Sequence, residues 1–409
     1  MNLNKKQMAY LEENYGKSIL PLSSFENEDQ IGLDPIEVLL YYKKDWTFEE
    51  YAEAFQKAAH HFNLFSSRLI MIDDNKFALH YCTDGVDFHH LPSMDSTFDN
   101  INIDDVKKKI VKVKTLPGEP LLALTGIQIK DGWLGGVTCS HAVADGISLT
   151  LFLSIWGSII EGMDVPPPSP QRLFKGNPVS SDKIDKVFTP PLCELSDKIQ
   201  DRVKSNMRRY IKREYFTDEF LQENKNKAKL ENEKYIISSN QIITAFLIKK
   251  YHDVMLPDTD RIRLRSPINL RDVNPDIDPM YIGNAFLDLI TEFTKDEINK
   301  MSIPQIAYRL KESINNARSE NYIRKITFLS KYGEVEFNTD MIKDYSLINK
   351  DTDIVSSNLT HLSDLGTLGI GPDKGSFVNI TTAVPTGFLM LKEQSGRIFV
   401  DITSRYPLT

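Results

Sequence analysis

The stretch Gly-Gly-Val-Thr-Cys-Ser-His-Ala-Val-Ala-Asp-Gly, at positions 135–146, decides how the chain around it folds. Cys139 and His141 share one face of a predicted strand, because successive strand side chains point to opposite faces. His141 lies where this strand ends, and Asp145 leads into an apolar helix through Gly146, which tolerates unusual backbone angles. An imidazole has an unperturbed pKa of about 6.5, which suits general-base catalysis near neutral pH. The alternative is a buried histidine whose ring bonds only to the main chain.

Segments with period 2 and period 3.6 are interspersed along the rest of the chain, which predicts a mixed α and β fold. The helical spacing of apolar residues predicts helices at 47–62, 147–161, 241–252 and 303–316, and a polar helix from 217. Strands are predicted at 64–71, 77–82, 121–129, 133–140, 209–216, 261–268, 285–294, 376–383, 387–393 and 397–403. Thr47 with Glu50, and Ser238 with Gln241, form capping-box patterns that open two of these helices.

The chain has 409 residues, enough for two or three domains or for one large two-lobed fold. A Pro-rich stretch begins at 166 and ends the apolar helix before it, so it is the best candidate for a linker. We therefore expect an N-terminal lobe over 1–165, a crossover linker over 166–191 and a C-terminal lobe over 192–409.

Composition excludes several classes of protein. The formal net charge is −8, so no basic field favours binding to nucleic acid. Three scattered cysteines, Cys82, Cys139 and Cys193, do not form a disulfide framework or a zinc site, and no metal-ligand spacing is present. The N-terminus has no apolar leader segment, and the longest apolar stretch, 147–160, is shorter than the roughly 20 residues that span a bilayer. We expect a cytoplasmic protein with no membrane segment.

The pattern His-x-x-x-Asp-Gly from His141 to Gly146, followed by an apolar helix, resembles the chloramphenicol-acetyltransferase-like superfamily. This group includes the BAHD acyltransferases and the condensation domains of peptide synthetases. Further segments resemble the family in the right order along almost the whole chain: 58–69, 239–249, Pro267-Ile-Asn-Leu-Arg271 and Tyr281-Ile-Gly-Asn284. The resemblance implies an α/β fold of two similar lobes, with mixed sheets flanked by helices and an active-site channel at their interface.

The family's activity implies transfer of an acyl group from acyl-CoA to a hydroxyl or amine of a small molecule, in specialised metabolism. By resemblance, His141 is the general base. Asp145 points away from the imidazole and pairs with an arginine, which fixes the loop that contains Gly146. Arg271 is the matching position for this arginine, and Arg265 is a second candidate. No cofactor is expected to be bound permanently, acyl-CoA is a co-substrate, and the protein is expected to be a monomer.

The chain departs from the family pattern near its C-terminus. Asp364 and Gly366 remain from a stretch that usually reads Asp-Phe-Gly-Trp-Gly and is structural in the family. Asn358 carries an amide that could stabilise an oxyanion, or it is a turn residue in a polar loop. Its neighbours Ser356 and His361 are candidates for substrate binding, and a plain loop position is the alternative for His361.

The phosphates of CoA attract cationic side chains, hydroxyls and helix N-termini. The candidates for this contact are Ser238, Ser239, Lys212, Arg213 and Lys227. Each also has an ordinary explanation, as a helix cap or a surface residue.

Two other functions fit the same fold. One is a carrier-protein-dependent condensing or amide-forming enzyme, against which Ser140 stands where condensation domains usually have a second histidine. The other is a non-catalytic binding protein.

Overall fold

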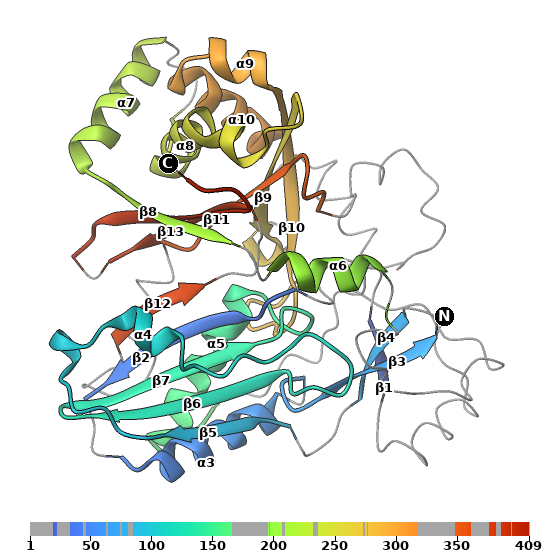
Figure 1. The fold of residues 1–409 in the computed structure, drawn as a ribbon, viewed down its shortest axis with the longest axis vertical. Helices are drawn as coiled ribbons and strands as arrows, with labels where there is room; N and C mark the ends of the chain where they lie inside the picture. The colour runs from blue at the N-terminus through green and yellow to red at the C-terminus, as the bar shows by residue number, and fades with distance from the viewer. Residues whose placement is uncertain are drawn as a thin grey trace.

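Two lobes, each built on a mixed β-sheet, make up the computed structural model (Figure 1). The structure describes residues 19–22, 33–43, 46–62, 64–73, 76–80, 85–165, 195, 197–206, 209–231, 236–272, 275, 277–317, 348–360, 376–381, 386–393 and 395–408. This arrangement agrees with the fold class predicted from the sequence. The predicted linker at 166–191 lies outside the described residues.

The first lobe, here called the N-lobe, is built on a five-stranded sheet with the order β12-β2-β7-β6-β5. The strands are β2 (Ile36–Tyr42), β5 (Asp87–Leu91), β6 (Leu122–Ile129), β7 (Gly132–Cys139) and β12 (Ser376–Thr381). Helices α3 (Phe48–His61) and α5 (Gly146–Ile160) pack on one face, and the short α4 (Ile103–Lys107) packs on the other. A small sheet beside it has the order β1-β4-β3, from β1 (Ile19–Pro21), β4 (Lys76–His80) and β3 (Arg68–Asp73).

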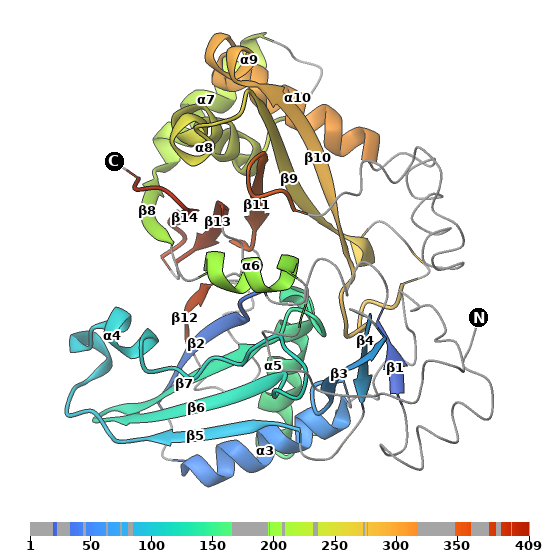
Figure 2. The ribbon, with the colours of Figure 1, turned by 45° about the vertical axis from the view of Figure 1, so that its right-hand side comes forward.

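The second lobe, here called the C-lobe, has a six-stranded sheet with the order β10-β9-β11-β13-β14-β8. Its strands are β8 (Tyr210–Phe216), β9 (Arg261–Asn269), β10 (Phe286–Thr294), β11 (Asp353–Asn358), β13 (Gly387–Lys392) and β14 (Ile398–Ser404). Helices α7 (Asp218–Glu231), α8 (Ser239–Met255), α9 (Lys295–Lys300) and α10 (Ile303–Ala317) cover one face of this sheet (Figure 2). On the other face, Leu389, Leu391 and Phe399 belong to the core cluster of the N-lobe, so the lobes share buried contacts.

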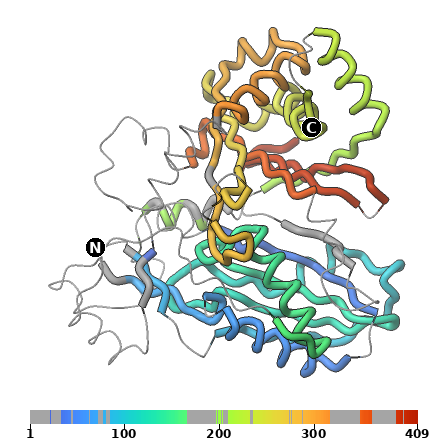
Figure 3. The backbone as a smooth tube through the Cα atoms, turned by 180° about the vertical axis from the view of Figure 1, so that it is seen from behind, coloured from blue at the N-terminus to red at the C-terminus, as the bar shows by residue number. Residues whose placement is uncertain are grey.

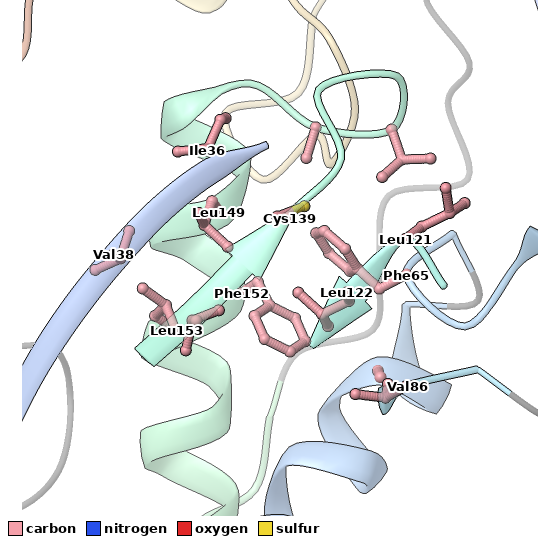
Figure 4. Close-up of a cluster of buried hydrophobic side chains, with 14 of the residues drawn as sticks. Ile36, Val38, Phe65, Val86, Leu121, Leu122, Cys139, Leu149, Phe152 and Leu153 are labelled. Carbon is pink, nitrogen blue, oxygen red and sulfur yellow. The ribbon is translucent and has the colours of Figure 1, made fainter. Parts of the chain in front are cut away.

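The core beneath the histidine motif is densely apolar. Cys139, Leu149 and Phe152 are fully or almost fully buried, and Figure 4 shows them gathered between β7 and α5. Helix α5 is apolar on all sides, which is typical of a helix buried in a large protein. The motif that connects β7 to α5 is therefore held in place by a tightly packed core.

Most of the predicted elements are present. The capping boxes at Thr47 and Ser238 are formed, and the hairpin of β6 and β7 is paired in antiparallel register. Asn358, for which a turn in a polar loop was one of two expectations, is the last residue of β11. Helix α7 is the polar helix predicted from 217, and it continues to Glu231.

The predicted boundary at 192 does not separate the two lobes. Strand β12 comes from the C-terminal part of the chain but pairs with β2 of the N-lobe sheet. Leu195 and Ile199, the latter on α6 (Asp197–Asn206), pack into the N-lobe core as well. The physical reason is that β2 would otherwise be an edge strand with unpaired backbone groups.

Candidate active site

His141 follows the end of β7 in a tight turn that the surrounding core holds in place. Ser140 donates its backbone N–H to the carbonyl of Leu121 at 2.8 Å and its hydroxyl to Thr115 at 3.0 Å. Ser140 and the segment 142–145 are buried, whereas His141 is partly exposed. The histidine is therefore the residue of this turn whose side chain is open to a ligand.

The imidazole of His141 lies against the start of β10, in the other lobe. The ring of Phe286 packs against it in an edge-to-face contact, with ring centroids 5.7 Å apart. The side-chain amide of Asn284 donates to the His141 carbonyl at 2.9 Å. Burial lowers the pKa of His141, against the opposing effects of its own backbone, the Asp145 charge and Asn284. A lowered pKa keeps the imidazole neutral, in the form that accepts a proton.

Asp145 is the N-cap of α5 and accepts the backbone N–H of Ser148 at 2.8 Å. Its second oxygen accepts the N–H of Ala285 at 2.9 Å and pairs with Arg271 at 2.9 Å. The predicted pairing of Asp145 with Arg271 is present. These partners occupy the carboxylate, and no described hydrogen bond joins it to the imidazole of His141.

Arg271 lies in the 3-10 turn η4 (Leu270–Asp272) between β9 and β10, whose pair extends from the C-lobe to the start of α5 (Figure 3). Its guanidinium also donates to the hydroxyl of Ser148 and to the carbonyl of Tyr281, at 2.8 and 2.9 Å. The Ser148 hydroxyl donates to the Gly283 carbonyl at 2.6 Å. The connection between β9 and β10 is thereby fastened to the start of α5.

Gly283 has a φ of +143°, a backbone conformation that residues with a side chain rarely adopt. A Cβ at this position would lie 2.5 Å from the hydroxyl of Tyr281. In contrast, Gly146 is the first residue of α5 and does not have a positive φ. The backbone freedom that we predicted for Gly146 is therefore required at Gly283 instead.

Asn358 ends β11. Its side-chain oxygen accepts the backbone N–H of Thr360 at 3.1 Å and the Thr360 hydroxyl at 2.8 Å. This turn leaves the N–H₂ group of Asn358 without a described partner, so it is available to donate. Ser356, two residues earlier, is buried and its hydroxyl bonds to Thr244 of α8 at 3.1 Å. This hydrogen bond satisfies the buried Ser356 hydroxyl, so no substrate is needed to explain its position. It also shows that the face of β11 with Ser356 and Asn358 points toward α8.

The structure separates two of the residues that we predicted to contact CoA. Lys212 and Arg213 point to opposite faces of β8, because neighbouring strand residues alternate. Lys212 lies over the ring of Tyr251 on α8, whereas Arg213 binds Asp401 of β14 through two hydrogen bonds of 2.6 and 2.8 Å. The two side chains therefore cannot contact the same phosphate, and the pairing with Asp401 supports the alternative that Arg213 is an ordinary surface residue.

Ser238 caps α8, and Ser239 lines an open hollow of about 570 Å³. The hollow is lined by Asp218, Glu219, Leu221, Gln222, Glu223, Lys225 and Ser239. Its three carboxylates outnumber its one lysine, which disfavours an anion inside it. Lys227 is exposed and pairs with Glu223 at 2.7 Å, so its charge is already partly compensated.

His361, Asp364 and Gly366 lie outside the described residues. Sequence reasoning did not assign a role to Asn284, Ser148 or Phe286, which the fold brings to the histidine motif. The family-like Tyr281-Ile-Gly-Asn284 stretch contained a signal for Asn284, but its distance in sequence from His141 hid the contact.

Within the described part of the chain, no group of His, Cys, Asp and Glu could hold a metal ion. No described helix is long and apolar enough to cross a membrane.

The chain is similar to known acyltransferases in sequence. It is 25% identical over 224 residues to an uncharacterized acetyltransferase of Arabidopsis thaliana, over 51% of this chain and 48% of the relative. It is 29% identical over 110 residues to the BAHD acyltransferase DCR of the same plant, over 24% of this chain and 23% of the relative. The matches thus span at most about half the length of these curated relatives.

Solved structures with the same fold cover almost the whole chain. TRI101 of F. sporotrichioides, solved with coenzyme A and T-2, is 14% identical with a TM-score of 0.65, over 94% of this chain and 95% of its own. Vinorine synthase is 17% identical with a TM-score of 0.65, over 95% of this chain and 92% of its own. The first condensation domain of the calcium-dependent antibiotic synthetase is 10% identical with a TM-score of 0.60, over 95% of this chain and 91% of its own.

The model of one protein family, described as the Transferase family, matches residues 4–362. This match covers most of the chain, and the fold and the acyltransferase relatives agree with it. The chain belongs to the Transferase family and is a BAHD-like member of it.

Proposed function

We propose that the protein transfers an acyl group from acyl-CoA to a hydroxyl or amine of a small-molecule acceptor, with His141 as the general base. The observation that supports this most is that the His141 imidazole is accessible and is kept neutral. It is partly exposed at the contact between the lobes, its pKa is lowered by burial, and Asp145 is bound elsewhere. A neutral histidine with an open ring nitrogen is what proton abstraction at neutral pH requires.

In the proposed reaction, Nε2 of His141 takes the proton of the acceptor hydroxyl or amine. The acceptor atom then forms a bond to the thioester carbonyl carbon and generates a tetrahedral oxyanion. As the oxyanion collapses, the carbon–sulfur bond breaks, and the departing CoA thiolate takes the proton from His141. General-base catalysis of this kind contributes about 10²- to 10⁴-fold to the rate.

Asn358 is proposed to stabilise the oxyanion through its N–H₂ group. The turn to Thr360 occupies its oxygen, so the amide can present only its donor side. Removing one such donor typically lowers kcat by about 10²- to 10³-fold. Asn358 lies on the face of the C-lobe sheet that packs against α8, which we propose as the donor side.

The donor proposal draws on TRI101, which was solved with coenzyme A. Here we propose that the start of α8, at Ser238 and Ser239, contacts a phosphate of CoA, since a helix N-terminus attracts anions. The three carboxylates of the hollow beside Ser239 oppose this contact, so the phosphate has to lie outside that hollow. Lys212 is a second contact on the same face of the sheet. Lys227 is paired with Glu223 and Arg213 with Asp401, so neither is favoured as a contact.

In this proposal, residues 1–165 supply the base and the C-lobe supplies the donor site. The protein acts as a cytoplasmic monomer in specialised metabolism, with no permanently bound cofactor. Light scattering of the purified protein tests the monomer.

The test is a release assay for CoA thiol with a panel of acyl-CoA donors and small alcohols and amines, with products identified by mass spectrometry. We expect turnover by the wild-type protein and a loss of at least about 10²-fold in His141→Ala. An unchanged rate in His141→Ala would contradict the role of the base. Binding of an acylated carrier protein without binding of free CoA would favour the condensing alternative, and absence of both would favour a binding protein.

A further inference from the structure

Asp288 of β10 has one carboxylate oxygen that is bound and one that is free. Its Oδ2 accepts a hydrogen bond from Nη1 of Arg265 at 3.1 Å. Its Oδ1 is buried and has no hydrogen-bond partner in the described part of the chain. Native proteins rarely leave a buried acceptor unpaired, so this oxygen indicates a partner that binds from outside the chain.

The other carboxylate that binds Arg265 has both of its oxygens paired. Asp353 of β11 accepts from Nε of Arg265 at 2.5 Å through Oδ2, and from the hydroxyl of Thr352 at 2.7 Å through Oδ1. Arg265, our second candidate for the partner of Asp145, binds these two carboxylates instead. Of the two, Asp288 is the one with an oxygen left for a ligand.

Asp288 lies on the face of the C-lobe sheet that is turned to the N-lobe. Phe293 of the same strand packs in the core under the helices, and strand residues alternate, so Phe286 and Asp288 face the other way. On that face, Leu389 belongs to the core of the N-lobe. Figure 1 shows the C-lobe helices on one side of this sheet and the N-lobe on the other.

This face also contacts the proposed base. Phe286 lies two residues before Asp288 and packs against the ring of His141, with ring centroids 5.7 Å apart. Two residues of a strand span about 7 Å, so the backbone of Asp288 is one small-molecule length from that of Phe286. The Asp288 side chain is 11% exposed, which leaves it within reach of a ligand. Because Asn358 lies on the helix face, which we propose as the donor side, the face with Asp288 is left for the acceptor.

The charges around Asp288 balance one another. Among the described residues of β9, β10 and β11, this face has three arginines and three carboxylates: Arg261, Arg263, Arg265, Asp288, Glu292 and Asp353. A balanced cluster does not attract an ammonium group through its charge, so a neutral hydrogen-bond donor suits the free oxygen better. Burial raises the pKa of Asp288 against the opposing effect of Arg265, as expected for a carboxylate whose pairing is incomplete.

We propose that Asp288 is an acceptor-binding residue: its Oδ1 accepts a hydrogen bond from a second hydroxyl of the acceptor, while the first hydroxyl reacts at His141. This inference rests on the proposed function, and it assigns the acceptor class as alcohols with two separated hydroxyls. Such a site rejects an alcohol that lacks the second hydroxyl, because the buried carboxylate is then left unpaired.

The test uses three alcohols that differ only at the end opposite the reacting group: 2-(4-hydroxyphenyl)ethanol, 2-(4-methoxyphenyl)ethanol and 2-phenylethanol. Saturation-transfer NMR measures their binding to the full protein without an acyl donor, and the CoA release assay measures kcat/KM. We expect the wild-type protein to bind and use the hydroxylated alcohol about 10- to 100-fold better than the other two, the effect of one hydrogen bond to a charged group.

Asp288→Asn reverses the polarity of the free position. Arg265 can only donate, so the asparagine oxygen has to face it, and the N–H₂ group takes the place of Oδ1. The ether oxygen of the methoxy alcohol can accept from this group. We therefore expect the advantage of the hydroxylated alcohol over the methoxy alcohol to disappear. Asp353→Asn is the matched control, since Asp353 binds the same arginine but has no free oxygen, and it is expected to keep the wild-type ratio.

Three outcomes would overturn the role of Asp288: no binding of any of the three alcohols, equal binding of all three by the wild-type protein, or the same change of ratio in Asp288→Asn and Asp353→Asn. An unchanged ratio in a folded Asp288→Asn would overturn it as well. Thermal unfolding shows whether the variants fold, and the wild-type comparison decides the matter if they do not. Preferred binding of the hydroxylated alcohol without any acyl transfer would instead contradict the proposed function and leave the Asp288 contact standing.

Discussion

Arg271 and Asp145, from opposite lobes, form a two-point ion pair at the start of α5. The nitrogen–oxygen distances are 2.9 and 3.3 Å, and the two side chains are only 4% and 8% exposed. Removing one partner of such a pair leaves a buried charge uncompensated, which is far more costly than losing an exposed pair. The carboxylate therefore acts on the shape of the site, and its substitution is expected to affect stability and activity together.

Asp145→Asn is predicted to lower the free energy of unfolding by about 3–5 kcal/mol, because it leaves the buried Arg271 charge without a counter-charge. Denaturant titration measures this change. Asp401→Asn is the matched control, since Asp401 also binds an arginine at two points, but Arg213 is 36% exposed. The control is expected to cost only about 0–1 kcal/mol. Equal costs for the two variants would contradict the inter-lobe role of Asp145.

The pH dependence of kcat/KM is predicted to show an acid limb with its midpoint below 6.5, the ordinary value for histidine, because burial lowers the pKa of His141. The sign follows from the chemistry: a protonated imidazole cannot accept a proton, so activity falls as the pH drops through the pKa of the folded state. Rates at saturating donor between about pH 5 and 8 measure the midpoint. A midpoint above 6.5 would mean that another group titrates or that His141 is more solvated than its surroundings suggest.

Calorimetry with free CoA is predicted to show weaker binding when the start of α8 is changed, and unchanged binding when Lys227 or Arg213 is changed. Ser239→Asp is expected to weaken binding roughly tenfold, about 1.4 kcal/mol, through repulsion of a phosphate. An acidic residue in the first turn does not harm the helix. Lys227→Ala and Arg213→Ala serve as controls and are expected to bind as the wild type does. The donor site lies elsewhere if either control weakens binding as much as Ser239→Asp.

Gly283→Ala is predicted to destabilise the protein and to lower kcat, because the new Cβ meets the Tyr281 hydroxyl and the backbone has a positive φ. Residues held in such conformations cost on the order of 1–3 kcal/mol, before the clash is counted. Gly162→Ala is the control: its φ is +71° and nothing lies within 4 Å of a Cβ there. It is expected to cost about 1–2 kcal/mol and to leave kcat unchanged. Thermal unfolding and initial rates of both variants distinguish the two positions.

Much of the secondary structure could be predicted from the sequence, because its periodic signals are strong. The capped helices α3 and α8 and the hairpin of β6 and β7 have clear patterns, and they form as expected. Strand β11 was missed because it is short and ends in polar residues. It is a parallel strand inside the C-lobe sheet, and its partners come from distant parts of the chain.

The candidate site could be predicted only in part. The pairing of Asp145 with Arg271 followed from the family resemblance, and the structure contains it. The contact of Asn284 with His141 depends on how the lobes meet, which no local pattern encodes. The separation of Lys212 from Arg213 could have been predicted, because both lie in the predicted strand 209–216 and neighbouring strand residues point to opposite faces.

The pairing of β12 with β2 has a consequence for how the protein is made. All seven residues of β2 are buried, yet its outer neighbour, which starts at Ser376, is translated more than three hundred residues later. At synthesis rates of about 5–20 residues per second, β2 waits on the order of 20 to 70 seconds on the ribosome with one edge open. An apolar strand with an open edge is a site of aggregation. Chaperone demand during expression is therefore expected to track the rate at which the last part of the chain is translated.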